Sequence, residues 1–306
     1  MTQDLSAEHL GHVFADAVER VAAGVVSVHG RQRLPGTGTV WASDETGTVI
    51  VTASHVVERE DQITVRIGDE EEDIPATLLG RDLSRDMAVL RIERNGIAPV
   101  ELATAEPRVG TLTMAVGRPF IPSTQASLGT VVFVGSIRFR NYRTGRMIHA
   151  DPTMYPGFSG GPLISSAGSV YGINTSGAAQ AGGITIPAEQ VSRIVADIVE
   201  HGFVQTPWLG ITVQQVDLAP EASAMFEGQE TALVVQSVNE GTPAEAAGLT
   251  TGDILIAMDG QPLEDVTDLQ QVLCHGRIGE SVSLVVYRDG ARHDVSVTTV
   301  ARPEQP

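Results

Sequence analysis

The sequence predicts a mostly β-stranded chain of two domains, an all-β barrel or sandwich followed by a smaller α+β module. Its 306 residues exceed one ordinary domain, which runs to roughly 100–200 residues. From Val25 to about Ile186, short β-branched runs such as GTVIVTAS, TLTMAVG and LGTVVFVGSI alternate with Gly, Pro, Asn and Asp. Many short strands separated by frequent turns are typical of a barrel or a sandwich.

Helical periodicity appears on both sides of this strand-rich region. Apolar residues at three- and four-residue intervals from Ser6 to Ala23 predict an amphipathic helix, so we assign residues 1–24 to an N-terminal helical arm. The same spacing from Pro187 to Gly202 predicts a second helix, with Gly202 as its C-cap. We therefore place the first domain at residues 25–203 and a linker at 204–208.

The second module is expected at residues 209–301, followed by a short tail at 302–306. Strands are predicted around LGITV, ALVVQSV, DILIAMDG, SVSLVVYRDG and HDVSVTTV. Two short helices are expected, at about Pro243 to Ala247 and Val266 to His275. The second helix has capping-box spacing at Thr267 and Gln270, in which each side chain would satisfy the backbone N–H of the other.

Composition excludes several classes of function. The chain has 20 basic and 38 acidic residues and a net charge of −18, which disfavours nucleic acid and anionic membrane surfaces as partners. Every basic residue is an arginine, so no lysine is present to act as a base or to form a Schiff base. Cys274 is the only cysteine, which excludes an intramolecular disulfide and argues against a zinc site. We expect no metal and no cofactor.

The sequence shows no targeting or membrane segment. No basic residue precedes Arg20, and no early apolar run is long enough for a signal peptide. No later stretch approaches the ~20 apolar residues of a membrane span. As written, the sequence predicts a cytoplasmic protein, and an extracytoplasmic one if a targeting segment has been removed.

Three residues are candidates for acyl-transfer chemistry. Ser159, in YPGFSGGPL, lies on a glycine-rich turn whose N–H groups would stabilise an oxyanion, although such a turn also simply connects strands. His55, at the end of the strand VIVTAS, would be the base, although a lone histidine there is more often a capped or packed residue. Asp86, before the strand MAVLRI, would orient that base, with Asp82 as its rival and a turn aspartate as the alternative.

His55, Asp86 and Ser159 follow the chain order of the two-barrel serine peptidases, in which the first barrel supplies His and Asp. TASHVV, DMAVLRI, AVGRPF and YPGFSGGPL resemble segments of the bacterial HtrA/Deg serine proteases. WLGI, VNEGTPAEAAGLTTGDILIAMDGQPL and TDLQQVL are similar to that family's PDZ domain, so the resemblance spans roughly Val13 to Val300. It implies an all-β two-barrel trypsin-like protease domain with an N-terminal helix, followed by an α+β PDZ domain. It also favours Asp86 over Asp82.

The resemblance implies roles for the residues around the candidate serine. Ser159 would be the nucleophile, and the backbone N–H groups of Gly157 and Ser159 would form the oxyanion hole. Phe158 stands where the family usually has asparagine, and Ser54 where asparagine or alanine is common. The specificity pocket is expected to contain Thr153, Thr175, Gly183 and Ile184, which favours cleavage after small or medium apolar residues.

In the second domain, Trp208, Leu209, Gly210 and Ile211 resemble a loop that binds a peptide's terminal carboxylate beside a pairing strand. Leu269 and Leu273 would contact the peptide's apolar side chain, and core packing is the alternative for some of these residues. The segment 138–146 carries four arginines. It is either a solvated hairpin or a sensor loop, and it has charges complementary to the acidic second domain.

The sequence therefore predicts a serine endopeptidase that cleaves unfolded or damaged polypeptides, with a PDZ domain that binds peptide C-termini. The alternative is a catalytically idle, chaperone-like adaptor that only binds peptide termini. The intact set of three residues favours the enzyme. The family resemblance further implies a homo-oligomer, a trimer assembled through the N-terminal arm.

Overall fold

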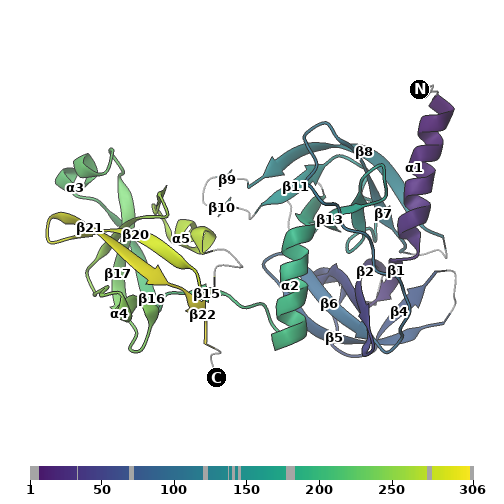
Figure 1. Ribbon diagram of the computed structural model, residues 1–306, viewed down its shortest axis with the longest axis horizontal. Helices are drawn as coiled ribbons and strands as arrows, with labels where there is room; N and C mark the ends of the chain where they lie inside the picture. The colour runs from purple at the N-terminus through teal and green to yellow at the C-terminus, as the bar shows by residue number, and fades with distance from the viewer. Residues whose placement is uncertain are drawn as a thin grey trace. The chain divides into compact units, whose positions relative to one another are not determined.

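The computed structural model describes residues 7–32, 34–68, 72–119, 123–136, 138–139, 142–143, 146–176, 183–273 and 278–303. The chain divides into two compact units (Figure 1). The first consists of Met1–Ile137 and Thr144–Val204, and the second of Gln205–Pro306 together with the short segment Arg138–Arg143. Within the described ranges, no helix is long and apolar enough to cross a membrane.

The first unit contains two closed antiparallel barrels, which confirms the predicted two-barrel fold. The first barrel, in the order β1–β2–β3–β6–β5–β4, consists of β1 (Val25–His29), β2 (Gly36–Asp44), β3 (Gly47–Ala53), β4 (Ile63–Ile67), β5 (Ile74–Asp82) and β6 (Met87–Ile92). The second, in the order β11–β14–β13–β12–β7–β8, consists of β7 (Leu112–Gly117), β8 (Gln125–Gly135), β11 (Met147–Ala150), β12 (Pro162–Ile164), β13 (Val170–Thr175) and β14 (Ile184–Pro187). A two-stranded ribbon, β9 (Arg138–Phe139) and β10 (Tyr142–Arg143), follows β8.

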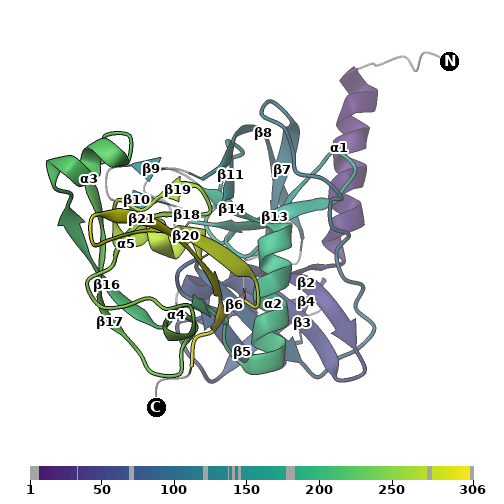
Figure 2. The ribbon, with the colours of Figure 1, turned by 60° about the vertical axis from the view of Figure 1, so that its left-hand side comes forward.

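Helix α2 (Ala188–His201) lies against the two barrels (Figure 2). Its apolar face belongs to a core that residues of both barrels share. The helix ends at Gly202, whose φ of 82° is left-handed and whose N–H donates to Ile198 O at 2.8 Å, as the predicted C-cap requires. Four buried apolar residues of α2 belong to this core: Val191, Ile194, Val195 and Ile198. The first barrel contributes Val49, Val51, Met87 and Val89. The second barrel contributes Met147, Ile173, Ile184 and Ile186.

Helix α1 (Ala7–Ala22) matches the helix predicted for residues 6–23 to within one residue at each end. Its positions Ala17 and Val21 are buried, and they pack with Met114 and Val170 of the second barrel. The apolar residues spaced three and four apart therefore form the face of the helix that packs against the barrel.

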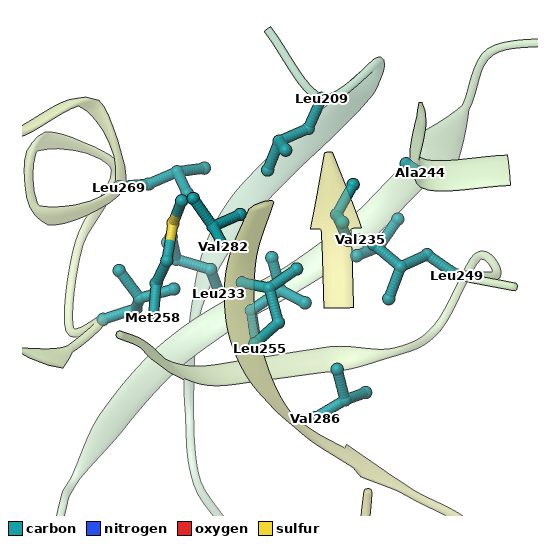
Figure 3. Packing of buried hydrophobic residues seen from close by; sticks show 13 residues of the cluster. Leu209, Leu233, Val235, Ala244, Leu249, Leu255, Met258, Leu269, Val282 and Val286 are labelled. Atoms are coloured by element: carbon teal, nitrogen blue, oxygen red, sulfur yellow. The ribbon is translucent and has the colours of Figure 1, made fainter. Parts of the chain in front are cut away.

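The second unit is a twisted antiparallel sheet covered by short helices. Its strands β16 (Ile211–Asp217), β17 (Thr231–Val238), β18 (Ile254–Met258), β20 (Ser281–Arg288) and β21 (Ala291–Thr298) follow one another in the sheet, and β19 (Gln261–Pro262) pairs with β18. A separate pair, β15 (Pro207–Trp208) with β22 (Val300–Ala301), joins the two ends of the unit. The core in Figure 3 contains Leu233, Leu255 and Val286 from strands of the sheet. Leu209 joins them from the loop before β16, and Leu269 from α5 (Val266–Val272).

Sequence reasoning about the helices of this unit was correct in part. Helices α4 (Pro243–Ala246) and α5 begin where expected, whereas α3 (Pro220–Met225) was not predicted. The capping box predicted at Thr267 and Gln270 was wrong, because the cap lies two residues earlier at Asp265 and Asp268. The Asp265 carboxylate accepts the Asp268 N–H at 2.9 Å, and Asp268 accepts the Asp265 N–H at 3.1 Å. Hydrogen bonds from N–H groups to an ionised carboxylate are stronger than those to a neutral acceptor, which favours the aspartate pair.

Candidate active site

His55 and Asp86 are brought together by strand pairing in the first barrel. Strands β3 and β6 pair with Ala53 opposite Met87, so the turn after β3 meets the turn before β6. His55 lies on the short 3₁₀ helix Ser54–Val56 that follows β3. Its backbone N–H donates to Asp86 Oδ1 at 2.9 Å, and the Ser54 N–H donates to the Asp86 carbonyl at 2.9 Å. Asp86 adopts a φ of 54°, a left-handed conformation that aspartate tolerates better than most residues.

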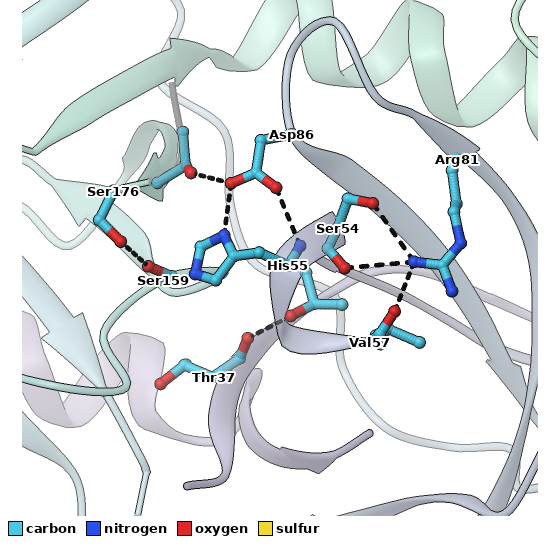
Figure 4. A network of polar contacts seen from close by, with 10 residues as sticks. Thr37, Ser54, His55, Val57, Arg81, Asp86, Ser159 and Ser176 are labelled. Carbon is cyan, nitrogen blue, oxygen red and sulfur yellow. Dashed lines mark hydrogen bonds and ion pairs between the residues drawn. The ribbon is translucent and has the colours of Figure 1, made fainter. Parts of the chain in front are cut away.

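The side chains of His55 and Asp86 form an oriented acid–base pair (Figure 4). His55 Nδ1 lies 2.6 Å from Asp86 Oδ2, and the Thr175 hydroxyl donates to the same oxygen. Burial alone would raise the pKa of Asp86, but hydrogen bonds from His55 and Thr175 outweigh it and hold that pKa below its usual range. An ionised carboxylate only accepts hydrogen bonds, so the His55 Nδ1–H is the donor in this contact.

Ser159 lies on a loop of the second barrel that the first barrel holds in place. Tyr155 to Phe158 form a turn closed by a 3.0 Å bond from the Phe158 N–H to Tyr155 O, with Gly157 at a φ of 87°. A Cβ on Gly157 would lie 2.3 Å from Pro119 Cβ, so only glycine fits there. From β2, the Thr37 hydroxyl donates to Gly157 O at 2.7 Å and the Thr37 N–H donates to Ser159 O at 3.1 Å.

The loop leaves two donors available for a substrate. Among the described residues, the backbone N–H groups of Gly157 and Ser159 have no acceptor. Figure 4 shows the His55 imidazole between Asp86 and Ser159. The Ser159 hydroxyl is hydrogen-bonded to the Ser176 hydroxyl at 3.1 Å, and either oxygen could be the donor.

The residues expected in the specificity pocket do not share one environment. Thr153 is exposed, and its carbonyl accepts a bond from Ser127 at 2.7 Å. Gly183 faces Met154, whose Cγ would lie 2.5 Å from a Cβ at that position. The Thr175 hydroxyl binds Asp86, and Ile184 is 7% exposed and belongs to the core around α2.

The expected peptide-binding loop of the second unit combines a free backbone with buried side chains. In the part of the chain that the structure describes, the N–H groups of Leu209 and Gly210 have no acceptor. Gly210 has a φ of 89°, and a Cβ there would lie 2.2 Å from Thr242 Cβ. The adjoining strand β16 is an edge strand of the sheet.

The side chains predicted for this groove are divided between core and periphery. Leu209 and Leu269 are 1% and 6% exposed and belong to the core of the unit. Ile211 and Leu273 are partly buried against that core, and Trp208 is half-buried in β15.

Sequence reasoning missed Thr37 and the bond from Thr175 to Asp86. Both threonines lie in β-strands, where β-branched residues are common, so their residue type did not mark them as part of the site. The segment 138–146 is described only in part, and the side chains of its residues 138–145 lie outside the described residues.

The barrels, the acid–base pair and the serine loop define a two-barrel peptidase unit of the trypsin-like type, joined to a PDZ unit. In agreement, the chain matches the family model of the trypsin-like peptidase domain over residues 36–173 and that of the PDZ domain over residues 207–299. The chain belongs to the HtrA/Deg family of serine proteases.

Individual relatives support this membership. A probable periplasmic serine endoprotease, DegP-like, from Ectopseudomonas mendocina (strain ymp) is 32% identical over 288 residues, which cover 90% of this chain. The match spans 59% of the length of that relative. The structure of the HtrA-type protease AlgW with a decapeptide has a TM-score of 0.71 at 27% identity and covers 95% of this chain and 99% of its own. The same protease with a tripeptide has a TM-score of 0.71 at 29% identity, with 95% and 98% covered.

Proposed function

We propose that this chain is a serine endopeptidase in which Ser159 is the nucleophile, His55 the general base and Asp86 the carboxylate that orients it. The observation that carries the proposal is the Asp86–His55 contact of 2.6 Å, which leaves Nε2 facing a serine on a loop with two unused N–H donors. Relatives named as serine endoproteases support the same activity.

The reaction follows from these positions. Ser159 Oγ attacks the carbonyl carbon of the substrate and gives its proton to His55 Nε2, while Asp86 stabilises the imidazolium. The N–H groups of Gly157 and Ser159 donate hydrogen bonds to the developing oxyanion. The amine leaves with the proton from His55, and water then hydrolyses the acyl-enzyme by the same path in reverse.

The test is the Ser159→Ala variant with unfolded casein as the substrate. We expect cleavage to be abolished while the circular dichroism spectrum stays unchanged, because the variant loses only the nucleophile. Ser166→Ala, which removes an exposed serine from a turn of the same barrel, is the matched control and should keep full activity. Near wild-type turnover by Ser159→Ala would refute the assignment.

Labelling separates this function from a catalytically idle, peptide-binding adaptor. A fluorophosphonate probe reacts only with an activated serine, so an enzyme is labelled at Ser159 and an adaptor is not. The oriented His55–Asp86 pair favours the enzyme, because an adaptor has no use for it.

We infer that the second unit binds peptides with free apolar C-termini by adding them as a strand to β16. The free N–H groups of Leu209 and Gly210 would hold the terminal carboxylate, and the partly buried Ile211 and Leu273 would contact the terminal side chain. Titration with a peptide acid and its amide tests this, since carboxylate capture requires much weaker binding of the amide. Equal affinity would contradict the proposal.

Substrate preference, location and assembly are proposed on separate grounds. Thr153 stands where an enzyme that cleaves after basic residues would have an acidic one, so mass spectrometry of casein fragments should show cleavage after small or medium apolar residues. Dominant cleavage after arginine or lysine would refute this.

The name of the periplasmic relative supports an extracytoplasmic location, which fractionation would test. A trimer assembled through α1 is tested by sedimentation of the chain with and without that helix.

A further inference from the structure

Arg81, at the end of β5, reaches across to the turn that carries His55 (Figure 4). Its Nη1 donates to three oxygens, Ser54 O at 3.2 Å, Ser54 Oγ at 3.3 Å and Val57 O at 2.5 Å. Its Nη2 donates to Arg59 O at 3.3 Å. One guanidinium group therefore connects the beginning of the 3₁₀ helix with the chain that leaves it.

The turn that carries His55 has few bonds of its own. The 3₁₀ helix is three residues long, its N-cap Ala53 provides no side-chain bond, and it is closed by the Val57 N–H bond to Ser54 O at 3.0 Å. Short 3₁₀ helices have weak internal hydrogen bonding, and their last carbonyls need outside donors. Arg81 supplies such a donor to Val57 O at the end of the helix and another to Ser54 O at its beginning.

Asp86 and Arg81 hold the turn through complementary groups. Asp86 accepts the N–H groups of Ser54 and His55, whereas Arg81 donates to carbonyls on either side of His55. Together they determine where the imidazole stands relative to the carboxylate that orients it. Ser54, which departs from the residues common in the family, adds its hydroxyl as a further acceptor for Arg81.

The contacts of Arg81 are not those of an ion pair. In the part of the chain that the structure describes, Arg81 is half-buried and forms no salt bridge, and its four hydrogen bonds all end on uncharged oxygens. Its neighbour Arg85, by contrast, pairs with Asp82 at 3.1 Å. A planar fork of donors matches several carbonyls at once, which a single ammonium group does not.

We propose that Arg81 is a positioning residue for the general base His55. The proposal rests on the proposed function, because a position for His55 has a rate consequence only if His55 is the base. A displacement of about 1 Å in a reacting group lowers turnover by about a hundredfold, so loss of this clamp should lower the rate by about 10- to 100-fold.

The experiment compares Arg81→Met with Arg66→Met in the full chain. Arg66 lies on β4 of the same barrel and forms an exposed ion pair with Asp73 at 2.6 Å, so its variant controls for loss of an arginine. The measurements are kcat and KM for a peptide substrate and the rate at which a fluorophosphonate labels the nucleophile. Circular dichroism and thermal unfolding report the folded fraction.

We expect Arg81→Met to lower kcat and the labelling rate by about 10- to 100-fold with KM within about twofold, because substrate contacts are untouched. Arg81→Lys should fall between Arg81→Met and the wild type, since it keeps donors but loses the fork. Wild-type rates in folded Arg81→Met would overturn the proposal. If Arg81→Met does not fold, wild-type kcat in Arg81→Lys would overturn it. Absence of labelling in the wild type and in Arg66→Met would refute the proposed function instead.

Discussion

Replacing Phe158 by alanine should disorder the loop that carries the candidate nucleophile. Phe158 directly precedes Ser159 and is 1% exposed. Its ring packs on Tyr155 with centroids 5.5 Å apart at 67°, and its Cδ1 would lie 2.6 Å from a Cβ on Gly117. Asparagine is usual at this position in the family, so here apolar packing anchors the loop.

The expected cost follows from burial. Removing a phenylalanine side chain from water is worth about 1.5–3 kcal/mol, and the cavity left by alanine brings the cost to about 3–5 kcal/mol. A domain is stable by about 5–15 kcal/mol, so the variant should remain folded. Losing one oxyanion donor costs about a hundred- to a thousandfold in turnover, so even a partly disordered loop should lower the rate by at least about tenfold.

Urea unfolding and fluorophosphonate labelling test both consequences of Phe158→Ala. Phe158→Leu is the matched control, because it keeps most of the apolar volume and should cost less than about 1.5 kcal/mol. The reasoning is wrong if Phe158→Ala is labelled at the wild-type rate and loses less than about 1 kcal/mol of unfolding free energy.

Three further predictions concern hydrogen bonds that the sequence did not reveal. Thr175→Val should lower kcat by about 10- to 150-fold, because a bond to a charged group is worth about 1.5–3 kcal/mol. An unchanged kcat would contradict the role given to its bond with Asp86. Ser176→Ala should raise the labelling rate of the candidate nucleophile about two- to tenfold by removing a competing bond of about 0.5–1.5 kcal/mol, whereas a lower rate would show that Ser176 assists. Asp253 is 1% exposed and bonded to Arg288 at 2.6 Å; burial alone would raise the pKa of Asp253, but the bonds from Arg288 help to lower it overall. Because the pKa of Asp253 is lowered by folding, its ionised carboxylate stabilises the fold above pH ~4, and this stabilisation is lost as the pH falls. Hydrogen exchange should therefore show that Asp253→Asn lowers the unfolding free energy by about 1–3 kcal/mol at pH 7 and by less at pH 3. An equal loss at both pH values would contradict this.

The sequence by itself determined the features that depend on local pattern. The spacing of apolar residues located α1 and α2, and Gly202 marked the end of α2, because both signals lie within a few residues of the structure they specify. The motifs around His55 and Ser159 identified the candidate site, since a catalytic residue and its turn are adjacent in the chain. The same reasoning chose the wrong residues for the cap of α5, where several polar side chains compete at neighbouring positions.

Only the tertiary structure decided which side chains support the site. Thr175 lies 89 residues from Asp86, Thr37 lies 120 from Gly157, and each pair meets only because two barrels close and pack together. Arg81 is near His55 because β5 and β3 both pair with β6, a register that no local pattern states. A hydrogen bond depends on angles and distances of tenths of an ångström, which the packing of the two barrels and α2 fixes and which residue spacing does not encode.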